Sequence, residues 1–111
     1  MWIFTETGFV SVVRHYSESG VVVVRARDRK SLEGLMNQTD APLMQSPYND
    51  YPYRVHIRDE EFQAWLAGVS SHIDYTNFKD RVHDTRGSDF AHALMGVWNI
   101  MHDVEDRRAR K

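Results

Sequence analysis

A run of valines at residues 21–24 is the strongest constraint on what this chain can fold into. Valine branches at Cβ, which disfavours a helix and suits an extended strand. The stretch before it, residues 9–16, is also rich in β-branched side chains, and residues 17–20 read Ser-Glu-Ser-Gly, a polar turn of hairpin length. We therefore predict an antiparallel hairpin formed by residues 9–16 and 21–27.

Two further strands are predicted, at residues 2–4 and 53–58. Along the second of these, apolar side chains alternate with basic ones, which is typical of a strand with two different faces. The apolar set is Tyr53, Val55 and Ile57, and the basic set is Arg54, His56 and Arg58. Between the strands we expect a short helix at residues 29–37, started by Asp28, and a long loop at residues 38–50.

After residue 59 the apolar side chains recur at helical spacing. Asp59, Asp74 and Ser88 are each placed where a side-chain oxygen can cap the start of a helix, and residues 83–87 interrupt the pattern. The apolar stripe of the last helix consists of Phe90, Leu94, Val97, Trp98 and Met101. We assign the tryptophans at positions 2, 65 and 98 to the core.

The order β-β-β-α-β-α-α-α predicts an α+β fold. We expect a three- to four-stranded, mainly antiparallel sheet, built from N-terminal hairpins plus the strand 53–58, with the helices packed on one face. A length of 111 residues fits a single domain spanning 1–111.

Composition narrows the function classes. The chain has no cysteine, which excludes disulfides, thiolate zinc sites and thiol catalysis. No signal-peptide pattern or membrane-length apolar run is present, so we expect a cytoplasmic protein with no membrane partner. The net charge of -2 argues against binding nucleic acid by bulk charge and against a heavily acidic DNA mimic, although local patches stay open.

Five short segments of the chain together carry a resemblance to known proteins. They are residues 1–4 (MWIF), 8–13 (GFVSVV), 24–28 (VRARD), 51–55 (YPYRV) and 73–79 (IDYTNFK). In this order they resemble a set of small proteins from bacteria and their phages. The resemblance implies a bacterial or mobile-element accessory protein, and it transfers no catalytic residue.

Basic side chains gather on the predicted sheet. Arg25 and Arg27 share one side of their strand because strand side chains alternate, and Arg54, His56 and Arg58 share a side of theirs. If the hairpin register places residue 16 opposite residue 21, Arg14 lies on the same face as Arg25 and Arg27. A register shifted by one residue would place Arg14 on the other face. Such a face could bind single-stranded nucleic acid. The alternative, which we favour, is a solvated face whose arginines pair with residues 59–61.

The sequence offers one candidate metal site and one candidate acid–base site. Among the histidines, only the group His83, Asp84, Asp89 and His92 could surround one corner, and no recognised ligand spacing is present, so we expect no metal and no cofactor. Residues 74–79 hold an acid, a phenol, an amide and an amine, but we strongly favour the alternative, a helix start capped by Asp74. We therefore expect no catalytic residues, and enzyme activity stays open but disfavoured.

The loop 38–50 and the tyrosines near its end could form a protein-binding surface. Long loops in compact domains are often functional, and Tyr is enriched at interfaces. The relevant side chains are Tyr48, Tyr51 and Tyr53. Our leading hypothesis is a small non-enzymatic protein that acts by protein–protein contact, for instance as an inhibitor of a host defence complex of the anti-CRISPR kind. The alternatives are a nucleic-acid-binding module and a structural homodimer.

Overall fold

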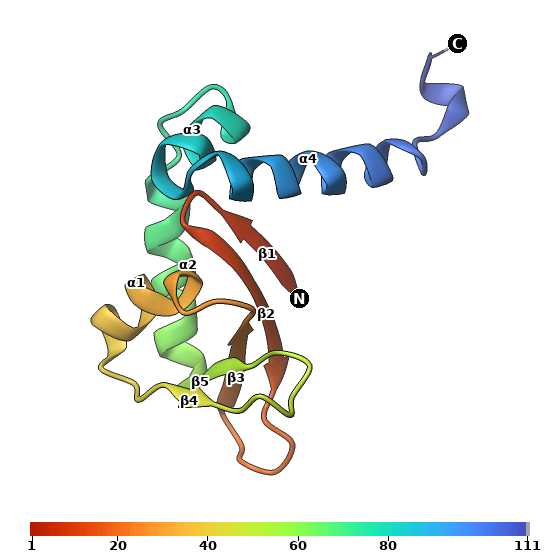
Figure 1. Ribbon diagram of the computed structural model, residues 1–111. Helices are drawn as coiled ribbons and strands as arrows, with labels where there is room; N and C mark the ends of the chain where they lie inside the picture. Colours follow the sequence, from red (N-terminus) through yellow and green to blue (C-terminus); the bar gives the residue numbers. More distant parts are fainter. Residues whose placement is uncertain (111) are drawn as a thin grey trace. The chain divides into compact units, whose positions relative to one another are not determined.

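The computed structural model describes residues 1–110 (Figure 1). Its elements in chain order are β1 (Trp2–Thr5), β2 (Gly8–Arg14), β3 (Val21–Ala26), α1 (Lys30–Thr39), β4 (Met44–Gln45), β5 (Tyr53–Arg58), α2 (Asp59–Ser71), α3 (Phe78–Arg86), α4 (Ser88–His102) and a final 3₁₀ turn, Arg107–Arg110. The chain divides into two compact units, one formed by Met1–Asp74 and one that begins at Tyr75.

The first unit contains a five-stranded sheet in the order β1-β2-β3-β5-β4, with every neighbouring pair antiparallel. This confirms the α+β class and the antiparallel sheet. The sheet gains a strand over the predicted three or four because β4, inside the expected loop 38–50, pairs with β5. A strand of two residues is too short to show an alternating pattern.

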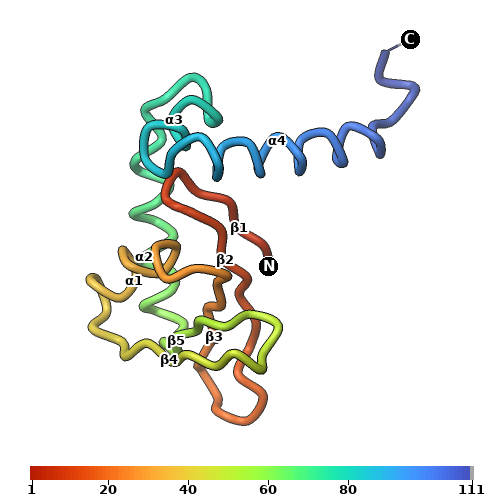
Figure 2. The backbone as a smooth tube through the Cα atoms, viewed as in Figure 1, coloured from red at the N-terminus to blue at the C-terminus, as the bar shows by residue number. Residues whose placement is uncertain are grey.

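The valine hairpin forms as predicted, with its turn extending beyond the sheet in orange (Figure 2). Val22 and Val24 of β3 face the helices, while Val21 and Val23 face the other way, and all four are buried. Both faces of β3 are therefore apolar near the turn, which is unusual for a sheet covered on one side.

Helices α1 and α2 pack on one face of the sheet and close the core there. The core side chains of the sheet come from the alternate positions Val10, Val12, Val22, Val24, Val55 and Ile57. Leu32 and Leu35 of α1 and Trp65 of α2 complete this cluster. These apolar side chains, two from each of β2, β3 and β5, thus fix which face carries the helices and which does not.

The helix starts differ in detail from the expected caps. At α1 the Asp28 carboxylate accepts from the Ser31 N–H at 3.1 Å, as its position suggested. At α2 the cap is made by Glu61, which accepts from the Arg58 N–H at 3.0 Å, so Asp59 is free to pair elsewhere. At α3 the cap is Asn77 rather than Asp74, because the helix begins only at Phe78.

The second unit is a helical hairpin of α3 and α4. Gly87 separates the two helices with φ of +90°, a conformation that favours glycine, so the break is one residue rather than the expected 83–87. The unit buries Val82 and Ala91, but Trp98 of α4 is 60% exposed. Its assignment to the core was therefore wrong. Within residues 1–110, no helix has the length and apolar character needed to span a membrane.

Candidate functional site

One row of side chains crosses the whole sheet on the face away from α1 and α2. The registers place Trp2 opposite Ser11, Ser11 opposite Arg25, Arg25 opposite Arg54, and Arg54 opposite Met44. Directly opposed residues in a sheet project from the same face. We call this side of the first unit the arginine face, since two arginines stand at the centre of its row.

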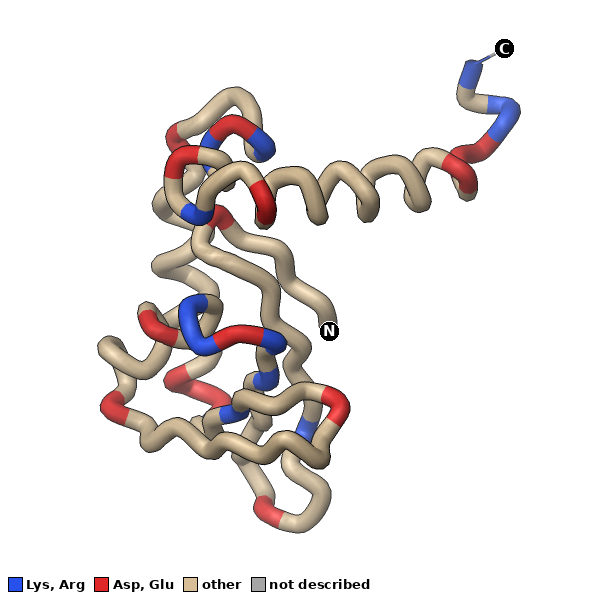
Figure 3. Tube along the Cα trace, in the orientation of Figure 1, with Lys and Arg blue, Asp and Glu red and all other residues tan. Residues whose placement is uncertain are grey.

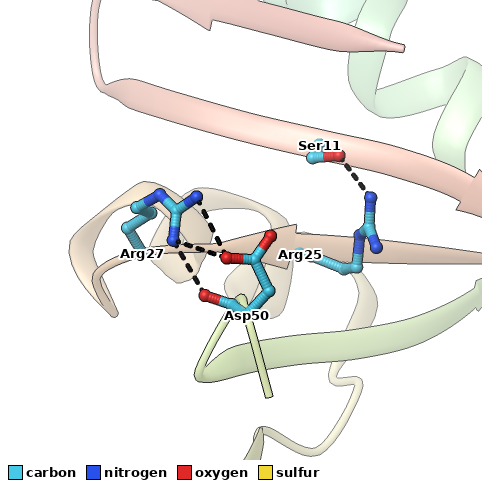
Figure 4. A network of polar contacts seen from close by, with 4 residues as sticks. All are labelled: Ser11, Arg25, Arg27 and Asp50. Atoms are coloured by element: carbon cyan, nitrogen blue, oxygen red, sulfur yellow. Dashed lines mark hydrogen bonds and ion pairs between the residues drawn. The ribbon is translucent and has the colours of Figure 1, made fainter.

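Arg25 is held in place by its neighbours without an acidic partner. Its Nη2 donates to the Ser11 Oγ at 2.7 Å (Figure 4). Its guanidinium carbon lies 4.6 Å from the centre of the Tyr51 ring, within the range of a cation–π contact. The Nε of Arg25, however, is buried and has no hydrogen-bond partner.

Arg54 has fewer partners still. Its Nε is also buried without a hydrogen bond, and no carboxylate among the described residues lies within ion-pair distance of it. Like charges directly opposite each other on adjacent strands are destabilising, and an unsatisfied buried donor costs about 1–3 kcal/mol. The pair Arg25–Arg54 is therefore an arrangement that an anion between the two side chains would stabilise.

Tyr51 and Arg27 brace one end of this face. Arg27 donates to the backbone carbonyl of Asp50 at 2.8 Å and lies 3.4 Å from its carboxylate (Figure 4). The guanidinium carbon of Arg27 also lies 4.4 Å from the centre of the Tyr51 ring. The Tyr51 ring is thus in contact with two guanidinium groups, and the residue is only 5% exposed. Tyr51 positions the arginines and offers little surface to a partner.

Arg14 does not belong to this face. The hairpin register pairs Arg14 with Val22. A register shifted by one residue would pair Arg14 with Val23 and place it on the same face as Arg25. Arg14 therefore projects to the helix side and pairs with Asp59 at the start of α2. Arg58, near the opposite end of β5, lies 3.6 Å from the Glu61 carboxylate. Arg14 and Arg58 are thus solvated arginines that pair with residues 59–61, as expected, whereas Arg25 and Arg54 make no such ion pair with the described residues.

Exposed aromatic rings flank the arginine pair on the β1 side. Trp2 is 69% exposed and meets the ring of Phe9 edge-on, with ring centres 5.9 Å apart. Phe9 in turn stacks on Phe4 at 4.6 Å. Trp2 was expected in the core, but β1 is an edge strand and Ile3 faces the helices, so Trp2 and Phe4 must point the other way. The alternation of side-chain direction along the predicted strand 2–4 was the sequence signal that could have placed Trp2 and Ile3 on opposite faces.

A second group of rings lies toward the hairpin turn. His56, beside Arg54 on β5, meets His15 at 4.9 Å, and His15 stacks on Tyr16 at 4.8 Å. Tyr16 is almost fully exposed. Burial lowers the pKa of His56 from its ordinary value, and the nearby charges of His15 and Arg54 lower it further, while Glu18 opposes them. His56 therefore resists taking up a proton while this face is empty.

The remaining expected binding residues are separated. Tyr53 opposes Ala26 and packs against the core on the helix side, so it is not part of the arginine face. Tyr48, in the β4–β5 loop, is 95% exposed and makes no ring contact among the described residues. The tyrosines at 48, 51 and 53 thus do not form one surface.

The other sequence candidates form structural contacts. In the part of the chain that the structure describes, no group of three or more His, Asp or Glu side chains is arranged to hold a metal ion. Asn77 caps α3, and Tyr75 packs against Phe78 and under Arg81. These contacts agree with the capped helix start rather than with an acid–base site.

Comparison with protein-family models, with curated proteins and with solved structures gave no match.

Proposed function

We propose that the arginine face binds single-stranded nucleic acid, with a backbone phosphate between Arg25 and Arg54. The observation that carries this proposal is the opposed pair of arginines whose Nε atoms are buried and unpartnered. Arginine presents several N–H donors in a planar fork that matches the oxygens of a phosphate. A phosphate that accepts from the accessible Nη groups would offset the repulsion between the two charges.

The distribution of ion pairs supports an anionic partner at this point. Arg27, Arg14 and Arg58 each have a carboxylate nearby, at Asp50, Asp59 and Glu61. Arg25 and Arg54 of the sheet have no such carboxylate partner among residues 1–110. A local pair of this kind is compatible with a net charge of -2, because binding would depend on two positioned charges rather than on the charge of the whole chain.

The exposed rings support a nucleic acid rather than a small anion. Single-stranded nucleic acids are bound by charged side chains that contact the backbone and by aromatic rings on which bases stack. Trp2 stands in the same row as the arginine pair, and Tyr16 extends a ladder of rings that begins at His56 beside it. Two bases could therefore stack on either side of a phosphate held at the centre.

The proposal is tested by titrating the protein into fluorescently labelled oligonucleotides of about ten nucleotides, which suits small sheet-based sites. We expect micromolar binding at low salt. Two neutralised phosphates predict a slope of log K against log salt of about -1.4 for a single strand. A duplex of the same sequence should bind more weakly, because its bases are not free to stack. Absence of binding at low salt would remove the proposal.

A second candidate function is contact with another protein through α4, and a separate observation favours it. Figure 3 shows no charged residue along the length of α4 between its two ends. The large apolar side chains exposed there are Val97, Trp98, Ile100 and Met101. A helix that is apolar on several sides is usually covered by a partner.

In this candidate the chain would be a bacterial or phage accessory factor that covers a surface of a host protein, as an anti-CRISPR inhibitor does, or it would form a homodimer. Sedimentation of the purified protein distinguishes the two forms. A concentration-dependent dimer that Trp98→Ala dissociates supports the homodimer. A monomer, together with capture of a defined host protein that Trp98→Ala prevents, supports the inhibitor.

A further inference from the structure

A separate cavity of about 230 Å³ lies on the helix side of the first unit. The turn after β1, the middle of α1 and the second half of α2 form its walls, with Trp65 and Thr5 as its most buried lining residues. Because α1 and α2 cover the sheet face opposite to Arg25 and Arg54, this cavity is independent of the arginine face.

Two helical glycines belong to the lining of this cavity. Gly34 of α1 and Gly68 of α2 both line it, and a methyl group added at either position would meet no atom within 4 Å. Glycine is less favourable than alanine inside a helix. Neither position has the positive φ that would require glycine. The visible effect of both glycines is therefore to keep the walls of the cavity apart.

The lining also carries hydrogen-bonding groups that no described residue satisfies. Trp65 is 6% exposed, and its indole N–H donates to none of the described residues but is not fully buried, so it remains accessible to a ligand. The Gln38 carboxamide likewise has no partner among them. The His72 Nδ1 lies 2.7 Å from the Gly68 carbonyl, which can only accept, so in the neutral ring Nε2 is left as an acceptor.

We propose that this cavity binds a small, planar, uncharged molecule of one aromatic ring that carries both a carbonyl group and an N–H group. Its ring would pack against Trp65, its carbonyl would accept from the Trp65 or Gln38 N–H, and its N–H would donate to the Gln38 oxygen or the His72 Nε2. The lining residues include no lysine or arginine, so an anionic ligand would find no cationic side chain of that kind there. The volume, below that of typical drug sites, sets the limit at a fragment-sized molecule.

Benzamide is a suitable probe, because it has one ring, one carbonyl and one NH₂ group. Trp2→Phe and Trp98→Phe leave Trp65 as the only tryptophan, so its fluorescence reports on the cavity alone. We expect saturable quenching with a dissociation constant on the order of 1 mM, which is typical for so small a ligand. Benzoate, which is charged, and toluene, which lacks polar groups, should each bind at least about tenfold more weakly.

Glycine variants provide the decisive comparison. Gly68→Ala should raise the melting temperature by about 4 °C and weaken benzamide binding, because it favours the helix and narrows the cavity. Gly68→Leu should abolish binding. Gly96→Ala in α4 is the matched control, since a methyl group there also meets no atom but the residue lies outside the cavity; it should stabilise without affecting benzamide.

The proposal is overturned if benzamide gives no saturable quenching, or if Gly68→Ala binds it as well as the parent. The alanine variant keeps this test valid even if Gly68→Leu fails to fold. Oligonucleotide binding should be the same in Gly68→Ala and the parent. The benzamide titration therefore tests the cavity and the oligonucleotide titration tests the arginine face, each independently of the other.

Discussion

Arg25 on β3 and Arg54 on β5 occupy directly opposed positions in the sheet, and the Nε atom of each is buried without a hydrogen-bond partner. Such a pair weakens the empty protein, since like charges oppose each other and two donors are left unsatisfied. Features that weaken the folded state in this way are concentrated at sites that bind or react.

Replacing both arginines by methionine should separate binding from stability. We expect Arg25→Met combined with Arg54→Met to reduce oligonucleotide affinity by about 100-fold, because hydrogen bonds from two charged groups are lost. The free energy of unfolding should stay within about 1 kcal/mol of the parent or rise, because apolar side chains of similar size often replace buried charges without loss. Urea denaturation and anisotropy titration measure the two quantities.

Arg14→Gln is the matched control for that experiment. It removes one positive charge from the helix side of the same sheet, where Arg14 pairs with Asp59. Its affinity for the oligonucleotide should equal that of the parent, and its stability should change by no more than about 1 kcal/mol, as for an exposed ion pair. An equal loss of affinity in this variant would indicate bulk charge rather than a site.

Trp2→Ala should weaken binding without unfolding the chain. Loss of one stacked base costs about 1–3 kcal/mol of binding free energy. Trp2 is mostly exposed, so the fold should tolerate the change. Isothermal titration against the same oligonucleotide measures the difference, with Trp98→Ala as the comparison. If the two variants bind equally well, Trp2 makes no contact with the ligand.

Tyr51 should matter for the fold through its ring and not through its hydroxyl group. The ring is buried against Arg25, Arg27 and Phe9, and the hydroxyl makes no hydrogen bond to the described residues. We expect Tyr51→Ala to lower the free energy of unfolding by about 3 kcal/mol, as for a buried aromatic side chain. Tyr51→Phe should be nearly neutral. Equal destabilisation by both changes would contradict this role.

His56 should make both stability and binding depend on pH. Its pKa is lowered in the folded state, first by burial and then by His15 and Arg54, so the unfolded chain binds the proton more readily. The folded state therefore loses stability as the pH falls below the ordinary histidine value of 6.5. A bound phosphate favours the protonated ring, so affinity should rise over the same range.

Titrations between about pH 7.5 and about pH 5.5 cover the window in which a histidine changes charge. His56→Gln should flatten both profiles, whereas His72→Gln, on the exposed end of α2, should leave them as in the parent. Unchanged profiles in His56→Gln would assign the pH dependence to another group.

The strands were predictable where the sequence has a pattern. The valine run and the alternation along β5 gave the hairpin and the placement of Arg54 and His56 correctly. The register of the hairpin was not predictable. Valines at 12 and 13 and at 22 and 23 put apolar side chains on both faces, so neither register exposes more apolar surface than the other. The face on which Arg14 lies was therefore left open by the sequence, and the observed register places it on the helix side.

The sequence predictions that were wrong concern residues whose environment is set by contacts between segments distant in sequence. Tyr51 looks like an exposed loop residue until the β4–β5 loop brings it under two arginines of β3. Trp2 and Trp98 were assigned to the core from residue type alone, but an edge strand and the surface of α4 leave them exposed. The pairing of Arg25 with Arg54 requires the β3–β5 contact, which no local pattern reveals.

The most direct test of the arginine face is a nuclear magnetic resonance titration of ¹⁵N-labelled protein with a single-stranded oligonucleotide. The account predicts shifts of the Nε–H signals of Arg25 and Arg54 and of the Trp2 indole, with the signals of Arg14 and of α4 unchanged. Shifts confined to α4, or no shifts at all, would contradict it.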